Sequence, residues 1–118
     1  MANGMIDGLR RVLDLRQQQH HLVAGNLANG ETPGFRARSI DFSTALNDAM
    51  AGNGGAPGAP IDAPILEADP TPWSTDGNAV LIERETANLQ ANSVMYRAVS
   101  AGLSRHLALL RFAAGDGR

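Results

Sequence analysis

Apolar residues in the first thirty positions of the chain recur at every third or fourth residue, which is the spacing of one helix face. The pattern predicts a helix over residues 5–28, preceded by a short disordered end at residues 1–4. Five consecutive polar residues at 17–21 interrupt the strip. A strip with a polar middle is typical of a helix that packs on other helices over a long, partly hydrated contact. The strip consists of Ile6, Leu9, Leu13, Val23 and Leu27, widened by Val12, Leu15 and Leu22.

A longer helix is predicted over residues 78–113, which contain no proline. Residues 76–78 suit an N-cap, and Glu83 and Glu85 fall in the first turns, where the helix dipole favours negative charge. Gly115-Asp116-Gly117 is expected to stop the helix. Its apolar residues form two strips, so the helix should make contacts on two sides. One strip comprises Leu81, Leu89, Tyr96, Val99, Leu103, Leu107 and Leu110, and the other comprises Val80, Ala87, Ala91, Val94 and Ala98.

The segment after the first helix contains several residues that favour particular backbone conformations. Asn29-Gly30 tolerates the left-handed conformation of a helix C-cap and is expected to end the first helix. Residues 32–35, Thr-Pro-Gly-Phe, suit a type II turn, because proline fixes φ at the second position and glycine adopts a positive φ at the third. An extended run should follow, and then a short helix at residues 43–50 that is capped by Asp41 or Ser43.

The rest of the middle gives weaker signals. Residues 51–64 are rich in Gly, Ala and Pro and should be flexible or ordered only by a partner, because they bury too little apolar surface to offset their entropy. Residues 65–73 should include an extended piece. Trp73, the only tryptophan, is interpreted as an anchor on the helices or as a contact to a neighbouring subunit. The predicted fold is mainly α, with long N- and C-terminal helices joined by an extended, irregular and loop-rich middle.

Composition limits the function classes. The chain has 118 residues, a net charge of −2 and no cysteine. There is therefore no general attraction to nucleic acid or anionic membrane, and disulfides and cysteine metal sites are excluded. The start of the chain lacks the basic-then-apolar order of a secretory signal, and no apolar run approaches the ~20 residues that cross a bilayer. The protein is expected to be cytosolic or exported without a Sec signal.

Charge is unevenly distributed along the chain. Residues 40–77 contain six acidic residues and no basic one. Arg36 and Arg38, just before this segment, are expected to pair with acids of the same chain or of a neighbouring subunit. Nucleic-acid binding is disfavoured, because two arginines in an acidic protein are a thin electrostatic footprint. Surface pairs of this kind are worth ~0–1 kcal/mol each, so they would set register and partner choice more than cohesion.

Candidate catalytic and metal-binding patterns are weak. His20 and His21 are adjacent, so on a helix they point about 100° apart and cannot share one metal ion. Glu83 and Glu85 are two residues apart and face different sides of a helix. No serine lies in a Gly-x-Ser-x-Gly elbow, and no glycine-rich phosphate loop is present. We therefore predict no catalytic residue, metal, cofactor or small-molecule ligand, and no enzymatic activity.

Two separated motifs resemble the bacterial flagellar basal-body rod, hook and hook-associated protein family. Leu27-Ala28-Asn29 followed by Thr32-Pro33-Gly34-Phe35-Arg36 is similar to the family's N-terminal signature, and residues 37–42 are most similar to its proximal rod members. Residues 76–85 and 92–96 resemble the opening and the Asn-x-x-x-Tyr segment of its C-terminal helix. The resemblance marks these interaction residues: Asn26, Leu27, Ala28, Asn29, Thr32, Pro33, Gly34, Phe35, Arg36, Arg38, Asp41, Phe42, Asn78, Val80, Glu85, Asn92 and Tyr96.

The resemblance implies a structural role. Residues 1–30 and 78–118 would pair as a coiled-coil-like hairpin, with residues 31–77 as the turn, junction and loop. Such hairpins stack into a hollow axial drive shaft that transmits torque and lets export substrates pass. The implied partners are further copies, rod proteins of the FlgC and FlgF types, a FliE-type adaptor, the MS ring and the export gate. The implied location is the periplasmic rod of the basal body, reached through the flagellar type III apparatus. The alternative is a free-standing helical adaptor or export-chaperone-like binding module, which would form a discrete complex of fixed stoichiometry.

Overall fold

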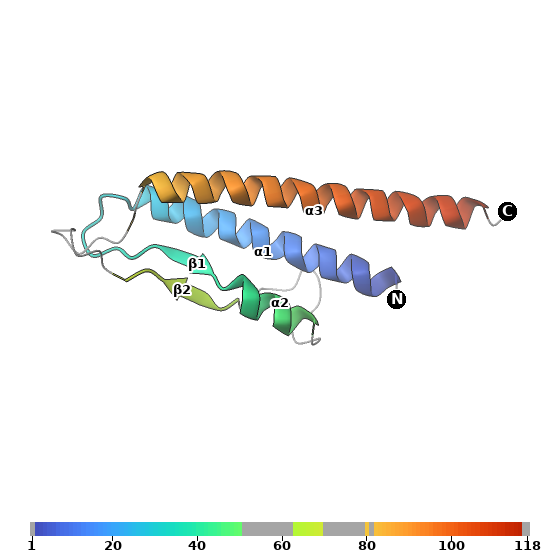
Figure 1. Cartoon of the computed structure of the whole chain (residues 1–118), viewed down its shortest axis with the longest axis horizontal. Coiled ribbons are helices and arrows are strands. Elements are labelled where there is room, and N and C mark those ends of the chain that lie inside the picture. Colours follow the sequence, from blue (N-terminus) through green and yellow to red (C-terminus); the bar gives the residue numbers. More distant parts are fainter. Residues whose placement is uncertain (1, 51–62, 70–79, 81, 117–118) are drawn as a thin grey trace.

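Two long antiparallel helices form the body of the molecule, and a small layer of two strands and one helix covers one side of the N-terminal helix (Figure 1). The computed structural model describes residues 2–50, 63–69, 80 and 82–116. The molecule is elongated, with extents of 69 × 26 × 18 Å. The mainly α fold with paired terminal helices is confirmed. Its elements are α1 (Ala2–Ala28), β1 (Arg38–Ile40), α2 (Phe42–Met50), β2 (Ile65–Glu67) and α3 (Ile82–Asp116).

Three helix ends differ from the prediction. Helix α1 begins at Ala2, so the expectation of disorder at residues 2–4 is wrong. Helix α3 begins at Ile82, so Val80 lies outside it and Glu83 and Glu85 fall in its first turn. Helix α3 also continues through Gly115 to Asp116. A glycine weakens a helix by about 1 kcal/mol but ends it only where the backbone turns left-handed.

The end of α1 lies where it was predicted, but its cap is different. Neither residue of Asn29-Gly30 has a positive φ. Instead, the Asn29 backbone N–H and side-chain Nδ2 both donate to the Gly25 carbonyl, at 3.1 and 2.8 Å. The Gly30 N–H donates to the Leu27 carbonyl at 3.2 Å, which tightens the last turn. The backbone at Gly30 lies close to the side chain of Ile82, at the start of α3. A Cβ at residue 30 would lie 2.5 Å from Cδ1 of Ile82.

The type II turn is confirmed. Among the described residues, Gly34 alone has a positive φ, of 75°. The Phe35 N–H donates to the Thr32 carbonyl at 3.2 Å, which closes the four-residue turn. Glycine has no Cβ, so it adopts this conformation without the steric cost that other residues meet. The turn reverses the chain at one end of the α1–α3 pair and directs it back along α1 as β1 (Figure 1).

The predicted extended segments form an antiparallel sheet of β1 and β2, in which Ser39 lies opposite Leu66. The ladder continues on both sides through the Asp41 N–H to the Pro64 carbonyl and the Ala68 N–H to the Ala37 carbonyl, at 2.9 and 2.8 Å.

The short helix α2 was predicted within one residue of its start. Its cap is Asp41 and not Ser43, since the Asp41 carboxylate accepts hydrogen bonds from the Thr44 backbone N–H and Oγ1, at 3.3 and 2.8 Å.

The hydrophobic core is small and lies between α1 and the β1–α2 layer. Leu15, Ile40 and Ala45 are its buried members, and Leu22, Phe42, Leu46 and Ala63 pack against them. Val23 is also fully buried. By contrast, α3 keeps large apolar side chains exposed, including Val94, Met95, Leu109 and Phe112. The chain therefore buries one side of its longest helix and leaves another apolar side uncovered.

Candidate assembly surfaces

Asn26 joins three elements of the fold. Its side chain is only 2% exposed. Nδ2 donates to the Arg38 carbonyl at 2.8 Å and to the Glu85 carboxylate at 2.9 Å, while Oδ1 accepts from the Arg38 N–H at 2.9 Å. Glu85 is itself buried. Asn26 and Glu85 are both among the residues marked by the family resemblance. Their hydrogen bonds connect α1 to β1 and to the first turn of α3.

Gln19 makes a second tie that sequence reasoning missed. It lies in the polar stretch that was interpreted as hydrated, yet it is buried, and its Oε1 accepts a 2.8 Å hydrogen bond from the Ile40 N–H. With Asn26, it satisfies backbone groups on the edge of β1 that faces α1. The only sequence signal is spacing, because Gln19 and Asn26 are seven residues apart and so lie on the same face of α1.

Asn92 connects the middle of α3 to α1. Its Nδ2 donates to the Arg16 carbonyl at 2.7 Å, and its Oδ1 accepts from Arg16 Nη1 at 3.3 Å. The Arg16 guanidinium also stacks on the Phe42 ring, with Cζ 4.0 Å from the ring centroid. Burial lowers the pKa of Arg16, because it removes water from the charged form. Arg16, another residue that sequence reasoning missed, thus spans α1, α2 and α3.

The residues between α1 and β1 differ in how far they are exposed. Leu27 and Phe35 are half-buried, and the Thr32 hydroxyl donates to Asn29 Oδ1 at 3.0 Å. The side chains of Ala28, Pro33 and Arg38 are exposed, as is Gly34. Asn78 lies outside the described residues, and Val80 is half-buried just before α3.

Arg36 confirms the expectation of pairing with the acidic middle segment. Its Nε donates to the Ala68 carbonyl at 2.6 Å, its Nη2 lies 3.2 Å from Asp69 Oδ1, and its Nη1 lies 3.8 Å from Glu67 Oε2. These contacts hold the end of β2 and the residues that follow it against Arg36, which precedes β1. Within the described chain, Arg36 is therefore a local brace for the two-stranded sheet.

Helix α3 carries two strips of residues spaced alternately three and four apart. The inner strip is Glu85, Leu89, Asn92, Tyr96, Val99, Leu103, His106 and Leu110, and all but Tyr96 are buried or half-buried. The outer strip is Ala87, Ala91, Val94, Ala98, Ala101, Arg105, Ala108 and Phe112, and every member is exposed. The second apolar strip expected from the sequence is therefore uncovered by the chain itself from Ala87 onward.

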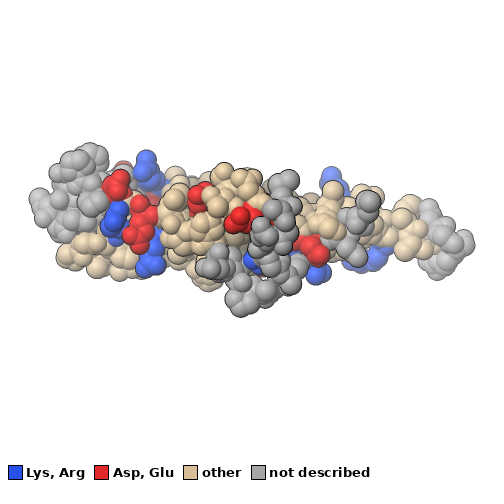
Figure 2. All heavy atoms as spheres, turned by 90° about the horizontal axis from the view of Figure 1, so that it is seen from below, with Lys and Arg blue, Asp and Glu red and all other residues tan. Residues whose placement is uncertain are grey.

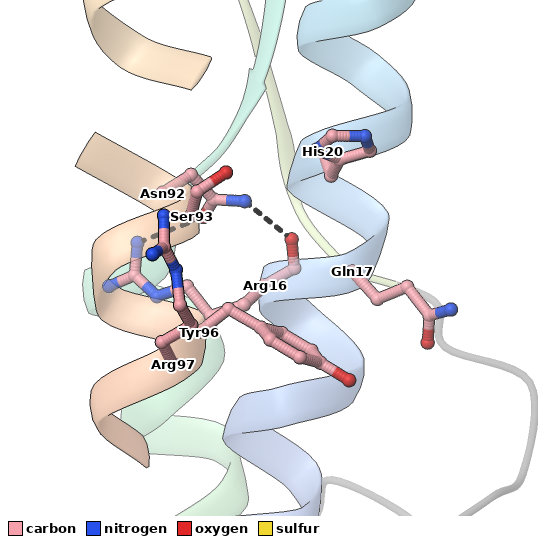
Figure 3. A pocket seen from close by; sticks show the side chains of 7 residues that line it. All are labelled: Arg16, Gln17, His20, Asn92, Ser93, Tyr96 and Arg97. Atoms are coloured by element: carbon pink, nitrogen blue, oxygen red, sulfur yellow. Dashed lines mark hydrogen bonds between the residues drawn. The ribbon is translucent and has the colours of Figure 1, made fainter. Parts of the chain in front are cut away.

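A groove of about 320 Å³ opens between α1 and α3 beside this inner strip (Figure 3). It is lined by Arg16, Gln17, His20, Asn92, Ser93, Tyr96 and Arg97. Two of these side chains are cationic and none is acidic. Arg16 Nε is buried and finds no hydrogen-bond partner among the described residues. Gln17 points away from α3, whereas Arg16 reaches across to Asn92 (Figure 3).

Two searches of the described residues bear on other site classes. No group of three or more His, Asp or Glu side chains in this part of the chain is arranged to hold a metal ion. None of the helices, as far as they are described, combines the length and apolarity that a membrane span requires. His20 and His21 meet edge to face, with ring centroids 6.1 Å apart.

Comparison with known proteins gives one consistent result. No protein-family model matches the chain. It is 35% identical over 106 residues to the flagellar basal body rod protein FlgB of Proteus mirabilis strain HI4320, covering 75% of this chain and 77% of that protein. It is 33% identical over 113 residues to FlgB of Yersinia enterocolitica, covering 80% and 82%, and 34% identical over 109 residues to FlgB of Cereibacter sphaeroides, covering 82% and 83%. The chain therefore belongs to the FlgB family of flagellar basal body rod proteins.

Proposed function

We propose that the chain is a structural subunit of the proximal rod, and that its α1–α3 hairpins pack side by side into the wall of a hollow tube. The tube transmits torque along the axis and lets export substrates pass through its centre. The observation that carries the proposal is the outer strip of α3, which is exposed along its length in the single chain and is apolar at every position except Arg105. Family membership supports the rod assignment.

The spacing of the outer strip fits a helix as its cover. Alternating steps of three and four residues keep a seam in register with a second helix. From Ala87 to Phe112 the strip covers 26 residues, and the rise from the first to the last is roughly 38 Å at about 1.5 Å per residue. Its alanines would allow a close approach between backbones. Val94 and Phe112 are 60% and 69% exposed, and burying each against a neighbour would gain about 1.5–3 kcal/mol.

The C-terminal end of α3 adds a second reason to expect neighbours. Helix α3 has 35 residues and α1 has 27, and the C-terminal end of α3 projects beyond the N-terminus of α1 (Figure 1). Leu109, in this last part of α3, is 60% exposed. An overhanging apolar helix end leaves surface that only another molecule can bury. The hairpin is thus incomplete as a free-standing unit.

The partners follow from this role. They are further copies of the chain, rod proteins of the FlgC and FlgF types, a FliE-type adaptor, the MS ring and the export gate. The subunit would reach the periplasmic rod through the flagellar type III apparatus. We assign three exposed residues between α1 and α2 to contacts with neighbouring subunits. They are Pro33 and Gly34 of the turn, and Arg38.

The test places a charge on the outer strip. In cells that lack the native gene, Ala98→Glu should abolish swimming, because the strip could no longer be buried. Asn88→Glu is the matched control, since residue 88 is exposed on the same helix but lies about 100° round from Ala87. Circular dichroism should show that both variants fold like the wild type. If Ala98→Glu cells swim normally, the outer strip is not an assembly surface and the binding-module alternative gains ground.

A further inference from the structure

We propose that the free edge of β2 binds the same edge of a second copy of this chain, so that two molecules form a four-stranded antiparallel sheet about a two-fold axis. The proposal concerns the free subunit and goes beyond the proposed function, which concerns the assembled rod. Strand β2 lies on the far side of β1 from α1 (Figure 1). Its three residues, Ile65, Leu66 and Glu67, are all exposed.

The backbone groups on this edge have no partner in the part of the chain that the structure describes. The ladder hydrogen bonds at Pro64 and Ala68 fix the direction of every group between them. Hydrogen-bonded and non-hydrogen-bonded pairs alternate along an antiparallel ladder, so Leu66 bonds to β1. Ile65 and Glu67 therefore turn their N–H and C=O groups away from β1, where another strand could bond to them.

The opposite edge of the sheet is covered. Arg38 and Ile40 of β1 turn their backbone groups toward α1, where Asn26 and Gln19 form hydrogen bonds to them. Of the two described strands, only β2 therefore has an edge that can accept a further strand. A second copy of the chain offers the same edge, so two copies pair through β2 alone. Such a contact uses one patch on both molecules and is isologous.

Hydrogen bonding and charge select one register. With Leu66 opposite Leu66 of the second copy, Ile65 of each strand lies opposite Glu67 of the other, and each such pair exchanges two backbone hydrogen bonds. The next register in one direction places the two Glu67 carboxylates opposite each other, which is destabilising. The next register in the other direction moves Glu67 beyond the end of the facing strand. The symmetric register alone uses every free backbone group of both strands.

The side chains favour the same arrangement. Leu66 is 54% exposed and Ile65 is 38% exposed. Residues of a non-hydrogen-bonded pair have Cα atoms about 4.5 Å apart, so the two Leu66 side chains would pack directly against each other. The Glu67 carboxylate lies 3.8 Å from Arg36 Nη1, whose charge reduces the repulsion between the acids of the two copies. Acidic and basic side chains lie side by side on this face, toward the end that carries the turn (Figure 2).

The dimer is weak and reversible, because the contact is small. Strands of three residues bury much less than the about 800 Å² per partner of a standard interface. A two-fold dimer is closed and does not continue as a helical array. If the subunit builds a rod, as proposed above, the two β2 edges separate before assembly.

Cysteine cross-linking of the purified full-length chain tests the register, because the native chain has no cysteine. Leu66→Cys places two thiols opposite each other, within the Cα separation of about 4.4–6.8 Å that a disulfide spans. Oxidation with copper phenanthroline should give a covalent dimer and nothing larger. Glu67→Cys is the matched control, since its two Cα atoms would lie diagonally, about 8–9 Å apart, and it should give far less dimer.

Two outcomes of this experiment would overturn the proposal. Equal cross-linking of the two variants would show that the strands meet without the symmetric register. A Leu66→Cys chain that stays monomeric would show that copies do not pair through β2, and would leave the edge to an extended segment of a different protein.

Proline at the edge provides the second readout. Glu67→Pro removes an N–H that β1 does not use, so the variant should fold and the Leu66→Cys chain that carries it should lose the covalent dimer. Glu67→Ala, the matched control, keeps the N–H and should retain the dimer. Circular dichroism shows whether each variant folds like its parent. A dimer that persists in a folded Glu67→Pro variant would contradict pairing through the backbone; if that variant does not fold, the comparison of Leu66→Cys with Glu67→Cys decides.

Discussion

Asn26→Ala should be among the most damaging single substitutions in the chain, although it removes only a small polar group. In the native structure, three hydrogen bonds run from the Asn26 amide to both backbone groups of Arg38 and to the Glu85 carboxylate. Alanine would leave these groups without partners in a site where Asn26 is 2% exposed and Glu85 is also buried. The loss would therefore act on α1, β1 and the start of α3 together.

The magnitude follows from the cost of an unsatisfied buried group, which is about 1–3 kcal/mol and more for a charge. The three groups share one site, so their costs do not add fully, and we expect a loss of about 3–5 kcal/mol in the free energy of unfolding. A native domain has only about 5–15 kcal/mol in total. Asn26→Ala should therefore move the chain a large part of the way to unfolding.

Urea unfolding followed by circular dichroism measures this loss. The control is Asn88→Ala, an exposed asparagine of α3, whose replacement should leave stability unchanged or raise it slightly, because alanine is the better helix former. If the two variants unfold at the same urea concentration, the Asn26 bridge contributes nothing, and the idea that it joins the three elements is wrong.

Further predictions follow from the glycines and from Arg36. Gly34→Ala should lower stability by about 1–2 kcal/mol, because φ is 75° there, and Pro33-Gly34→Ala-Ala should abolish swimming. Gly25→Ala should raise stability by about 0.5–1 kcal/mol, since a Cβ there meets nothing within 4 Å; melting temperatures that shift the same way in both glycine variants would contradict this. Arg36→Met should cost about 1 kcal/mol at low salt and less at high salt, and a urea midpoint indifferent to salt would refute the ion-pair contribution.

Local signals in the sequence predicted most of the helices, strands and turns. The apolar spacing of α1, the absence of proline from α3 and the Pro33-Gly34 turn are each encoded within a few neighbouring residues. The start of α3 was misplaced because residues 76–78 look like a cap, and a cap signal of this kind does not fix which of several nearby turns begins the helix. The end was misplaced because Gly115 can remain helical when nothing forces it into a left-handed conformation.

The contacts between elements were harder to predict, because they depend on partners far along the chain. Nothing near Ser39 indicates that it pairs opposite Leu66. Polar residues such as Gln19 and Asn92 were interpreted as hydrated or as family markers, whereas each is buried and bonded to another element. One signal was available: Glu85 and Asn92 are seven residues apart, so both fall on the inner strip, where an apolar residue would otherwise be expected.

The most direct test of the central claim is an electron cryomicroscopy map of basal bodies that contain this chain. The account predicts that a helix of a neighbouring subunit runs along the outer strip from Ala87 to Phe112, with its axis about 8–10 Å from that of α3. A map in which this strip faces solvent or the central channel along its whole length would contradict the account.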